Sequence, residues 1–241
     1  MNRATAFLLH LVISGCVGLI LLLLFWFVWY PAPLGQAVGG IQIFLLLLVV
    51  DVLIGPVLTL VVFAKNKKSL RTDLAVIGVL QALALGYGLV TLLAGRPVYI
   101  AALGHRFDLI QANEIDDAAL DRSKRRLPWL GPEWVGTRTP DSQKQREALM
   151  FGGADLGSLP EFHVPIQDMR QELLARAQPI QQLKQLNAAK TTEIDAWLSR
   201  HGHNSSTVVY QGLRARNEDM AVVIETQTAK IVGIAPFKPW P

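Results

Sequence analysis

The sequence predicts a membrane protein in which a bundle of three N-terminal transmembrane helices precedes an α+β domain. About half of the 241 residues are hydrophobic and only 17% are charged, a balance that departs from that of ordinary soluble domains. The charges are also unevenly placed. Residues 1–95 contain five Lys or Arg and two acidic residues, whereas residues 96–241 contain eighteen basic and seventeen acidic ones. We therefore expect a transmembrane domain at 1–95 and a polar domain at 96–241.

Three apolar runs in the N-terminal part are long enough to cross the hydrocarbon core, which takes about 20 residues in a helix. They cover residues 6–29, 41–64 and 74–94. The first run is longer than the apolar region of a signal peptide and has no cleavage site before a soluble chain, so we expect an uncleaved span. Aromatic residues at its end are typical of a headgroup boundary, and Pro31 and Pro33 predict that the helix stops there.

The orientation of the spans follows from the loop at residues 65–73. Its first seven residues, KNKKSLR, contain four basic residues and no acid, and the positive-inside rule places such a loop in the cytoplasm. The N-terminus is then cytoplasmic, and residues 96–241 lie on the periplasmic side of a bacterial inner membrane. Basic residues in that long domain do not oppose this orientation, because long translocated domains largely escape the rule.

A polar site is predicted within the membrane around Asp51, near the middle of the second span. An ionised carboxylate there costs about 2.5 kcal/mol or more, so Asp51 is expected to be protonated or to face a partner. Tyr87 of the third span lies at nearly the same depth, which favours a hydrogen bond to Asp51, and Gln81 lies nearer the cytoplasm. Two interpretations stay open: Asp51 joins helices within the chain, or it receives the helix of a partner.

Small residues and a proline surround this site. Gly55 and Pro56 follow Asp51 by one turn and are expected to kink the second span, which frees backbone carbonyls near the acid. A proton relay is disfavoured because the spans offer one mid-membrane acid and too few helices for alternating access. Glycines that allow close helix packing are predicted on the first and third spans, at Gly15, Gly18, Gly78, Gly86 and Gly88.

The domain at 96–241 has the pattern of an α+β fold. Its start, to about residue 110, reads as extended chain, and a short helix is expected at 117–126. The Pro- and Gly-rich stretch that follows, with Trp129 and Trp134, is predicted to be a loop, as are residues 151–153 with Gly157. A helical stripe runs over 166–199 with a break at Pro179. The last segments, 206–216, 220–226 and 230–234, alternate as in an antiparallel meander.

The chemistry-bearing residues of this domain are scattered, so we expect no catalytic residue, no cofactor and no metal site. His201 and His203 form an H-x-H pair, but no second cluster of ligands accompanies them. Cys16, the single cysteine, lies in an apolar run. The domain is nearly neutral overall, which argues against nucleic-acid binding, and its basic cluster at 122–126 is interpreted as the solvated end of a helix.

A family resemblance is carried by an ordered set of motifs. These are DVLIGPVLTL at 51–60, KNKKSLRTDL at 65–74, Gln81, YG at 87–88 and RPVY at 96–99. Together they fix an intramembrane acid, a kink, a basic loop and a juxtamembrane Arg-Pro pair. With this pattern the chain resembles the TfpX/TfpZ family of type IV pilin accessory proteins. The resemblance implies a non-enzymatic inner-membrane helper of pilus biogenesis, chaperone-like, that serves a particular major pilin and thereby twitching motility.

Two kinds of function follow from these observations. In the first, Asp51 and the neighbouring spans engage the pilin transmembrane helix within the lipid bilayer, while the periplasmic domain contacts the pilin head or the inner-membrane assembly platform. The residues expected to take part are Asp51, Gly55, Pro56, Gln81, Tyr87, Arg96, Tyr99, Trp129 and Trp134, with Arg96 and Tyr99 serving either as a coupling point or as interfacial anchors. The alternative is a membrane-tethered ligand-binding sensor or an enzyme acting on an envelope component, which needs acids or histidines converging in a pocket.

Overall fold

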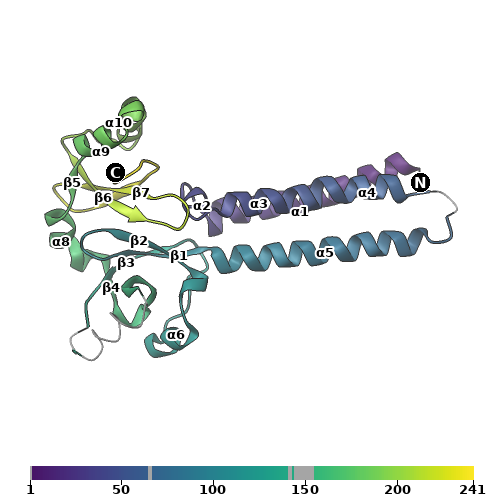
Figure 1. Ribbon diagram of the computed structural model, residues 1–241, viewed down its shortest axis with the longest axis horizontal. Coiled ribbons are helices and arrows are strands. Elements are labelled where there is room, and N and C mark those ends of the chain that lie inside the picture. Colours follow the sequence, from purple (N-terminus) through teal and green to yellow (C-terminus); the bar gives the residue numbers. More distant parts are fainter. Residues whose placement is uncertain (1, 65–66, 141–142, 144–154) are drawn as a thin grey trace.

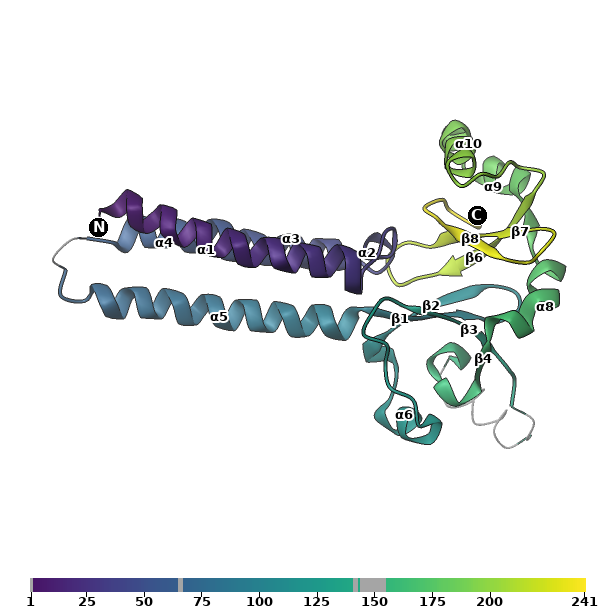
Figure 2. The same ribbon diagram turned by 180° about the vertical axis from the view of Figure 1, so that it is seen from behind.

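The computed structural model describes residues 2–64, 67–140, 143 and 155–241. It consists of a bundle of long helices and, at one end of the bundle, a domain in which helices pack on a curled sheet (Figures 1 and 2). The N-terminus lies at the free end of the bundle, and the C-terminus lies in the domain. The two parts meet where the third long helix ends and the first strand begins.

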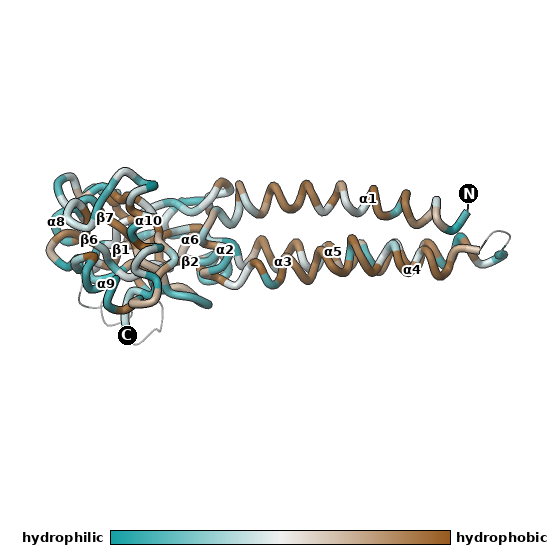
Figure 3. Tube along the Cα trace, turned by 90° about the horizontal axis from the view of Figure 1, so that it is seen from above, coloured by the Kyte–Doolittle hydropathy of each residue, from teal (hydrophilic) through white to brown (hydrophobic). Residues whose placement is uncertain are grey.

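Three helices of the bundle are long and apolar enough to cross a membrane, which confirms the three predicted spans. Figure 3 shows their hydrophobic character over most of their length. The third begins four residues earlier than expected. The first span is α1 (Arg3–Leu24) with the π-helical turn η1 (Phe25–Trp29), the second is α3 (Gly40–Leu48), the π-helical η2 (Val49–Ile54) and α4 (Gly55–Val62), and the third is α5 (Leu70–Gly95).

The second span packs against both of the others, and glycine permits the closest approach on each side. A Cβ atom added at Gly88 on α5 would lie 2.3 Å from the Leu47 Cδ1 atom, and one at Gly18 on α1 would lie 3.0 Å from Leu48 and Val52. The predicted role of glycine in packing is therefore confirmed at these two positions. It is wrong for Gly15, Gly78 and Gly86, whose surroundings are open.

The described residues of the domain form an eight-stranded mixed sheet with strand order β4-β3-β1-β2-β6-β7-β8, and β5 pairs with β6 beside this path. The β1–β3 and β2–β6 pairs are parallel, and the others are antiparallel. The strands are β1 (Pro97–Ala102), β2 (Phe107–Gln111), β3 (Glu133–Thr137), β4 (His163–Pro165), β5 (Gln178–Pro179), β6 (Val208–Arg214), β7 (Met220–Glu225) and β8 (Ile231–Ala235). The predicted C-terminal meander is thus confirmed as β6–β7–β8.

Both faces of the sheet are covered, because side chains of a strand alternate between them. On β7, Val222 and Ile224 face the core that continues to the membrane bundle, whereas Ala221 and Val223 face the helices at 180–200. The helical stripe predicted for 166–199 is divided into short helices, with Pro179 preceding one of them. The domain helices are α6 (Asp117–Ser123), α8 (Arg170–Ala175), α9 (Ile180–Leu186) and α10 (Thr191–Arg200).

Three strands were not predicted: β3, β4 and β5, the last of which lies at the break in the expected helical stripe. The Pro- and Gly-rich stretch that was expected to be a loop contains β3, which pairs in parallel with β1 and with β4 on its other side. The Gly and Pro residues around β3 are typical of a loop, although Trp134, Val135 and Thr137 are residue types that favour strands. Burial of Val135 and Gly136 in the sheet stabilises the strand further.

The tip of the first helical hairpin is embedded in the domain rather than lying free in water. Between the first two spans the chain forms α2 (Leu34–Ala37), and the Ala37 carbonyl accepts hydrogen bonds from the backbone N–H groups of Asn217 and Glu218 in the β6–β7 turn. Leu34 and Ala37 are buried in the same hydrophobic cluster as strand residues of β1, β2, β6 and β7. The membrane bundle and the sheet therefore share one core.

Tyr30 fixes the end of this hairpin that lies next to the domain to the third span. Its phenol donates a hydrogen bond of 2.6 Å to the Leu92 carbonyl, and burial raises the pKa of Tyr30, so that the phenol keeps the proton it donates. The ring fits because residue 40 is a glycine: a Cβ atom there would lie 2.6 Å from Tyr30 Cε1. Three chain segments are thus fixed to each other at the membrane boundary.

The buried His163 on β4 should make the stability of the protein pH-dependent. Its Nε2 atom bonds to the Gly157 carbonyl at 2.8 Å, its ring packs edge-on against Tyr99, and burial lowers its pKa. As the pH falls below about 6.5 the unfolded chain takes up a proton before the folded one does, so the free energy of unfolding decreases. We expect His163→Gln, which keeps a donor and does not titrate, to lose less stability on acidification than the wild type.

The measurement is denaturant unfolding in detergent micelles, followed by tryptophan fluorescence on both sides of this pH. Other titrating groups cancel in the comparison between the two proteins. Parallel pH profiles for wild type and His163→Gln would show that this histidine does not contribute.

Candidate functional site in the membrane domain

Asp51 of the second span is hydrogen-bonded to Gln81 of the third span. The Gln81 Nε2 atom donates to the Asp51 carbonyl oxygen at 3.1 Å and to the carboxylate Oδ1 atom at 3.3 Å. Asp51 is buried within the bundle. Its Oδ2 atom has no hydrogen-bond partner among the described residues, so one oxygen of the carboxyl group can still accept a further donor.

The backbone of the second span explains why Asp51 needs this amide. In the π-helical η2, the N–H of Gly55 donates to the Val50 carbonyl, one residue further back than in an α-helix. Pro56, the next residue, has no N–H to donate. The Asp51 carbonyl is therefore left without a partner within its own helix, and Gln81 supplies one. The predicted freeing of a carbonyl near the acid is confirmed.

Gly55 makes room for the Gln81 side chain. A Cβ atom at this position would lie 1.9 Å from Gln81 Nε2, so any larger residue would displace the amide. Asp51 thus supplies an acid, Gly55 leaves space for the Gln81 side chain one turn later, and Pro56 lacks the backbone N–H that would bond to the Asp51 carbonyl. These residues and Gln81, which were all predicted site residues, form one cluster.

The predicted bond from Tyr87 to Asp51 is wrong, because Gln81 occupies that place. Tyr87 is 78% exposed on the surface of the bundle. The error comes from the helix ends: Asp51 lies eleven residues before Val62, where α4 ends, and Gln81 lies eleven residues after Leu70, where α5 begins. The second span ends two residues before its expected end and α5 starts four residues before its expected start. Together these shifts bring Gln81, six residues before Tyr87, to the depth of the acid.

A groove of about 380 Å³ lies between the second and third spans beside Asp51. Asp51 is its one ionisable acid, and Tyr87 and Thr91 are the other residues in it that can form side-chain hydrogen bonds. The remaining lining is apolar: Ile43, Leu46, Leu47, Val50, Ala84, Leu85 and Gly88. A carboxyl group at the wall of an apolar groove within the bilayer is costly to leave unpaired, and such a group is a candidate partner site.

A second polar contact joins the first two spans away from this groove. His10 Nδ1 lies 2.6 Å from the Thr59 hydroxyl, so it links α1 to α4 in the part of the bundle nearer the loop at 65–73. That loop carries an ion pair of 2.7 Å between Lys67 and Asp73. The His10–Thr59 pair lines no part of the Asp51 groove, which makes it a useful comparison.

Arg96 connects the third span to the domain, at the junction where a coupling point was predicted. Its guanidinium group donates to the Leu93 carbonyl at 2.7 Å and lies 5.3 Å from the centre of the Trp129 ring. Tyr99 lies deeper, on β1, where it is buried against His163. Of the two residues, only Arg96 is placed at the membrane boundary.

Trp134 lines a groove of about 1190 Å³ in the domain, between the segment 166–174 and the hairpin β7–β8. Its ring packs edge-on against Phe107. One wall of the groove is the strand β8, which pairs only with β7 among the described strands. The groove is lined by both polar and apolar side chains.

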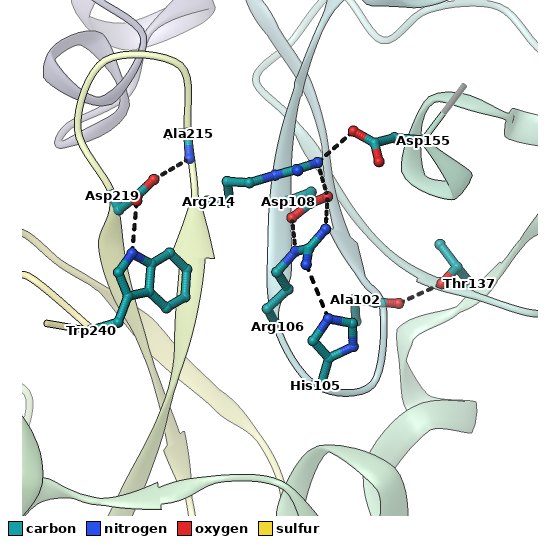
Figure 4. A network of polar contacts seen from close by, with 10 residues as sticks. All are labelled: Ala102, His105, Arg106, Asp108, Thr137, Asp155, Arg214, Ala215, Asp219 and Trp240. Carbon is teal, nitrogen blue, oxygen red and sulfur yellow. Dashed lines mark hydrogen bonds and ion pairs between the residues drawn. The ribbon is translucent and has the colours of Figure 1, made fainter. Parts of the chain in front are cut away.

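Charged residues converge elsewhere in the domain, as Figure 4 shows. The buried carboxylate of Asp108 accepts from Arg106 at 2.8 Å and from Arg214 at 2.7 Å, and Arg214 also reaches Asp155. Burial alone would lower the pKa of Arg214, but Asp108 and Asp155 raise it. Each acid in this network is paired with an arginine. The network therefore has the character of a structural ion-pair cluster that joins β2 to β6.

The histidine pair singled out in the sequence serves packing. His201 Nδ1 bonds to the Trp197 carbonyl at 2.7 Å, and its ring stacks on that of Trp197 at 3.8 Å. Within the described residues, no group of three or more His, Cys, Asp or Glu side chains is arranged to hold a metal ion. The residues 151–153, expected to be a loop, lie outside the described part of the chain.

The fold and the site together define a three-span membrane protein whose α+β domain is built onto the end of its helices opposite the loop at 65–73 and whose second span carries a partly satisfied acid. No protein-family model matches the chain, and no solved structure matches it. The chain is similar to fimbrial assembly proteins of Dichelobacter nodosus. It is 27% identical to the serogroup E1 protein over 204 residues, which is 80% of this chain and 78% of that protein.

Two further relatives carry the same description. The serogroup I protein is 26% identical over 204 residues, again 80% of this chain and 78% of that protein. The protein of serogroups C1 and C2 is 32% identical over 115 residues, which is 47% of this chain and 86% of that protein. The chain therefore belongs to the fimbrial assembly protein family. The predicted class of pilus-assembly protein is confirmed at this level, and the narrower TfpX/TfpZ assignment stays a prediction.

Replacing Gly55 by alanine should disrupt the Asp51 cluster. The new methyl group displaces the Gln81 amide and leaves the Asp51 carbonyl and carboxyl without their donor, at a cost of about 1–3 kcal/mol in the free energy of unfolding. Gly78→Ala is the matched control, since nothing lies within 4 Å of a Cβ atom there. Unfolding of both variants in mixed detergent micelles measures the difference. Equal stability of the two variants would contradict the assigned role of Gly55.

Proposed function

We propose that this protein is a non-enzymatic accessory protein of the bacterial inner membrane that binds the transmembrane helix of the major type IV pilin and promotes its assembly into pili. Membership of the fimbrial assembly protein family supports a role in pilus biogenesis. The basic loop between the second and third spans supports the cytoplasmic placement of that loop, and hence the periplasmic placement of the domain.

The observation that carries the proposal is the partly satisfied Asp51 at the wall of the groove between the second and third spans. Gln81 bonds to one carboxylate oxygen only, and the groove is otherwise mainly apolar. A single helix that brings a hydrogen-bond donor or a positive charge to this depth would satisfy the second oxygen and cover the apolar lining. A polar bond formed in hydrocarbon also selects the depth of the incoming helix.

The groove of the domain offers a second contact, for the head of the pilin or for a component of the assembly platform. Its wall includes the edge strand β8, to which an extended segment could add by backbone hydrogen bonds. Two contacts on one partner raise the effective concentration at the second site. They also fix the orientation of the partner, which a single membrane contact would leave free to rotate.

Loss of the Asp51 carboxyl group should weaken pilin binding while leaving the protein in the membrane. We expect Asp51→Leu to reduce co-purification of pilin by about tenfold or more, the effect of losing one charge-assisted hydrogen bond. Thr59→Val is the matched control, because it also removes an intramembrane polar bond, the one to His10, outside the groove. Unchanged pilin recovery with Asp51→Leu at normal protein levels would reject the proposed contact.

Deletion of the gene tests the function as distinct from the contact. Surface pilin, total pilin and twitching motility are measured in the deletion strain and after complementation. Loss of surface fibres with retained cellular pilin places the protein in assembly. Normal piliation would contradict the helper function and would favour a ligand-binding role for the periplasmic domain.

A further inference from the structure

The segment between α6 and β3 is fixed against the membrane end of the first span. The backbone N–H of Gly131 donates a hydrogen bond of 2.8 Å to the carbonyl of Val28, which lies in the last turn of that span. A Cβ atom at Gly131 would lie 3.9 Å from the Pro31 ring. These contacts set the height of the segment relative to the bilayer, because the apolar spans themselves define the membrane plane.

Arg96 holds the same segment from the side of the third span. Its guanidinium group donates to the Leu93 carbonyl at the end of α5, approaches the Pro128 carbonyl at 3.5 Å and lies over the Trp129 ring. The segment is therefore attached to the ends of two different spans. Because it is attached to the ends of both spans, the segment lies at the level of the lipid headgroups.

Two large apolar side chains project from this segment. Trp129 is 65% exposed and Leu130 is 81% exposed, and all other exposed large hydrophobic residues of the described chain lie in the membrane spans. Among its described residues, the domain thus exposes large apolar side chains only where this loop meets the membrane boundary. Trp is the residue type most typical of that boundary, since its ring is apolar and its N–H can bond to headgroups.

Three consecutive basic residues precede the apolar pair. Lys124, Arg125 and Arg126 are all exposed, and none of them forms an ion pair with another described residue, whereas Arg122 pairs with Glu161. Lys124 ends α6 in a left-handed conformation with φ of 55°, which turns the chain away from the helix axis. Basic side chains beside inserted apolar ones are the combination that binds anionic lipid surfaces.

From this arrangement we infer that residues 124–130 form an interfacial loop that binds anionic phospholipids in the leaflet facing the domain. Trp129 and Leu130 insert at the headgroup level, and the three basic residues contact lipid phosphates. The loop holds the domain at one tilt over the bilayer, and so fixes where the groove beside β8 faces. This binding needs no pilin and is independent of the proposed function.

The test uses the full-length protein in lipid nanodiscs. In a Cys16→Ser background, Leu130→Cys is labelled with an environment-sensitive fluorophore, and Ser199→Cys on the exposed face of α10 serves as the matched control. The nanodiscs contain phosphatidylcholine alone or phosphatidylcholine with phosphatidylglycerol. Quenchers attached to lipid chains and quenchers dissolved in water are applied to each sample.

We expect the label at position 130 to be quenched several-fold more by the lipid-attached quencher than the label at position 199, with the reverse order for the aqueous quencher. Phosphatidylglycerol should strengthen lipid quenching at position 130, and added salt should weaken that gain. The variant Lys124→Gln/Arg125→Gln/Arg126→Gln should lose the dependence on phosphatidylglycerol.

Three results would overturn the inference. Equal aqueous quenching at both positions would show that the loop lies in water. Equal lipid quenching with and without phosphatidylglycerol in the wild type would show that anionic headgroups are not recognised. Burial of the label at position 130 only after addition of purified pilin would show that the loop is a protein contact instead.

Discussion

The structure depends on the insertion of the first helical hairpin into the core of the sheet. Phe25, Tyr30 and Leu34 at the tip of that hairpin are buried together with residues of β1, β2, β6 and β7. The backbone of α2 is bonded to the β6–β7 turn as well. Because one hydrophobic core spans both parts, the domain cannot rotate freely over the helices. A partner that contacts both the helices and the domain therefore meets the two parts in one fixed relative orientation.

Within the membrane, a second constraint fixes the third span against the second. Hydrocarbon offers no water to satisfy a free carbonyl, and Pro56 leaves the Asp51 carbonyl without a donor in its own helix. Gln81 meets this need across the helix interface, over the gap at Gly55. The Gln81 amide bonds to only one carboxylate oxygen of Asp51. The contact that stabilises the bundle therefore leaves the second oxygen available in the groove. Stability and the candidate site thus arise from one arrangement.

The sequence predicted much of this candidate site but misplaced one partner. Asp51, Gly55, Pro56 and Gln81 were all recognised, because an acid, a glycine and a proline in an apolar span are conspicuous. Tyr87 was assigned to Asp51 in place of Gln81, since the start of α5 at Leu70 is hidden among polar residues. Helix ends are the least precise part of a prediction from sequence, and here the end of α4 and the start of α5 together shifted the expected partner of Asp51 by six residues.

What the sequence by itself determined were the features that depend on local composition: three spans, their helical form, the α+β domain and the alternating strands of the C-terminal meander. Hydrophobicity and periodicity are properties of short stretches of the chain, so they can be recognised in the sequence without the structure. Only the tertiary structure decided the parallel pairing of β2 with β6, the strand β3, the docking of α2 on the β6–β7 turn and the place of Trp129 at the membrane boundary. Each of these joins segments far apart in the chain, where packing rather than local preference sets the outcome.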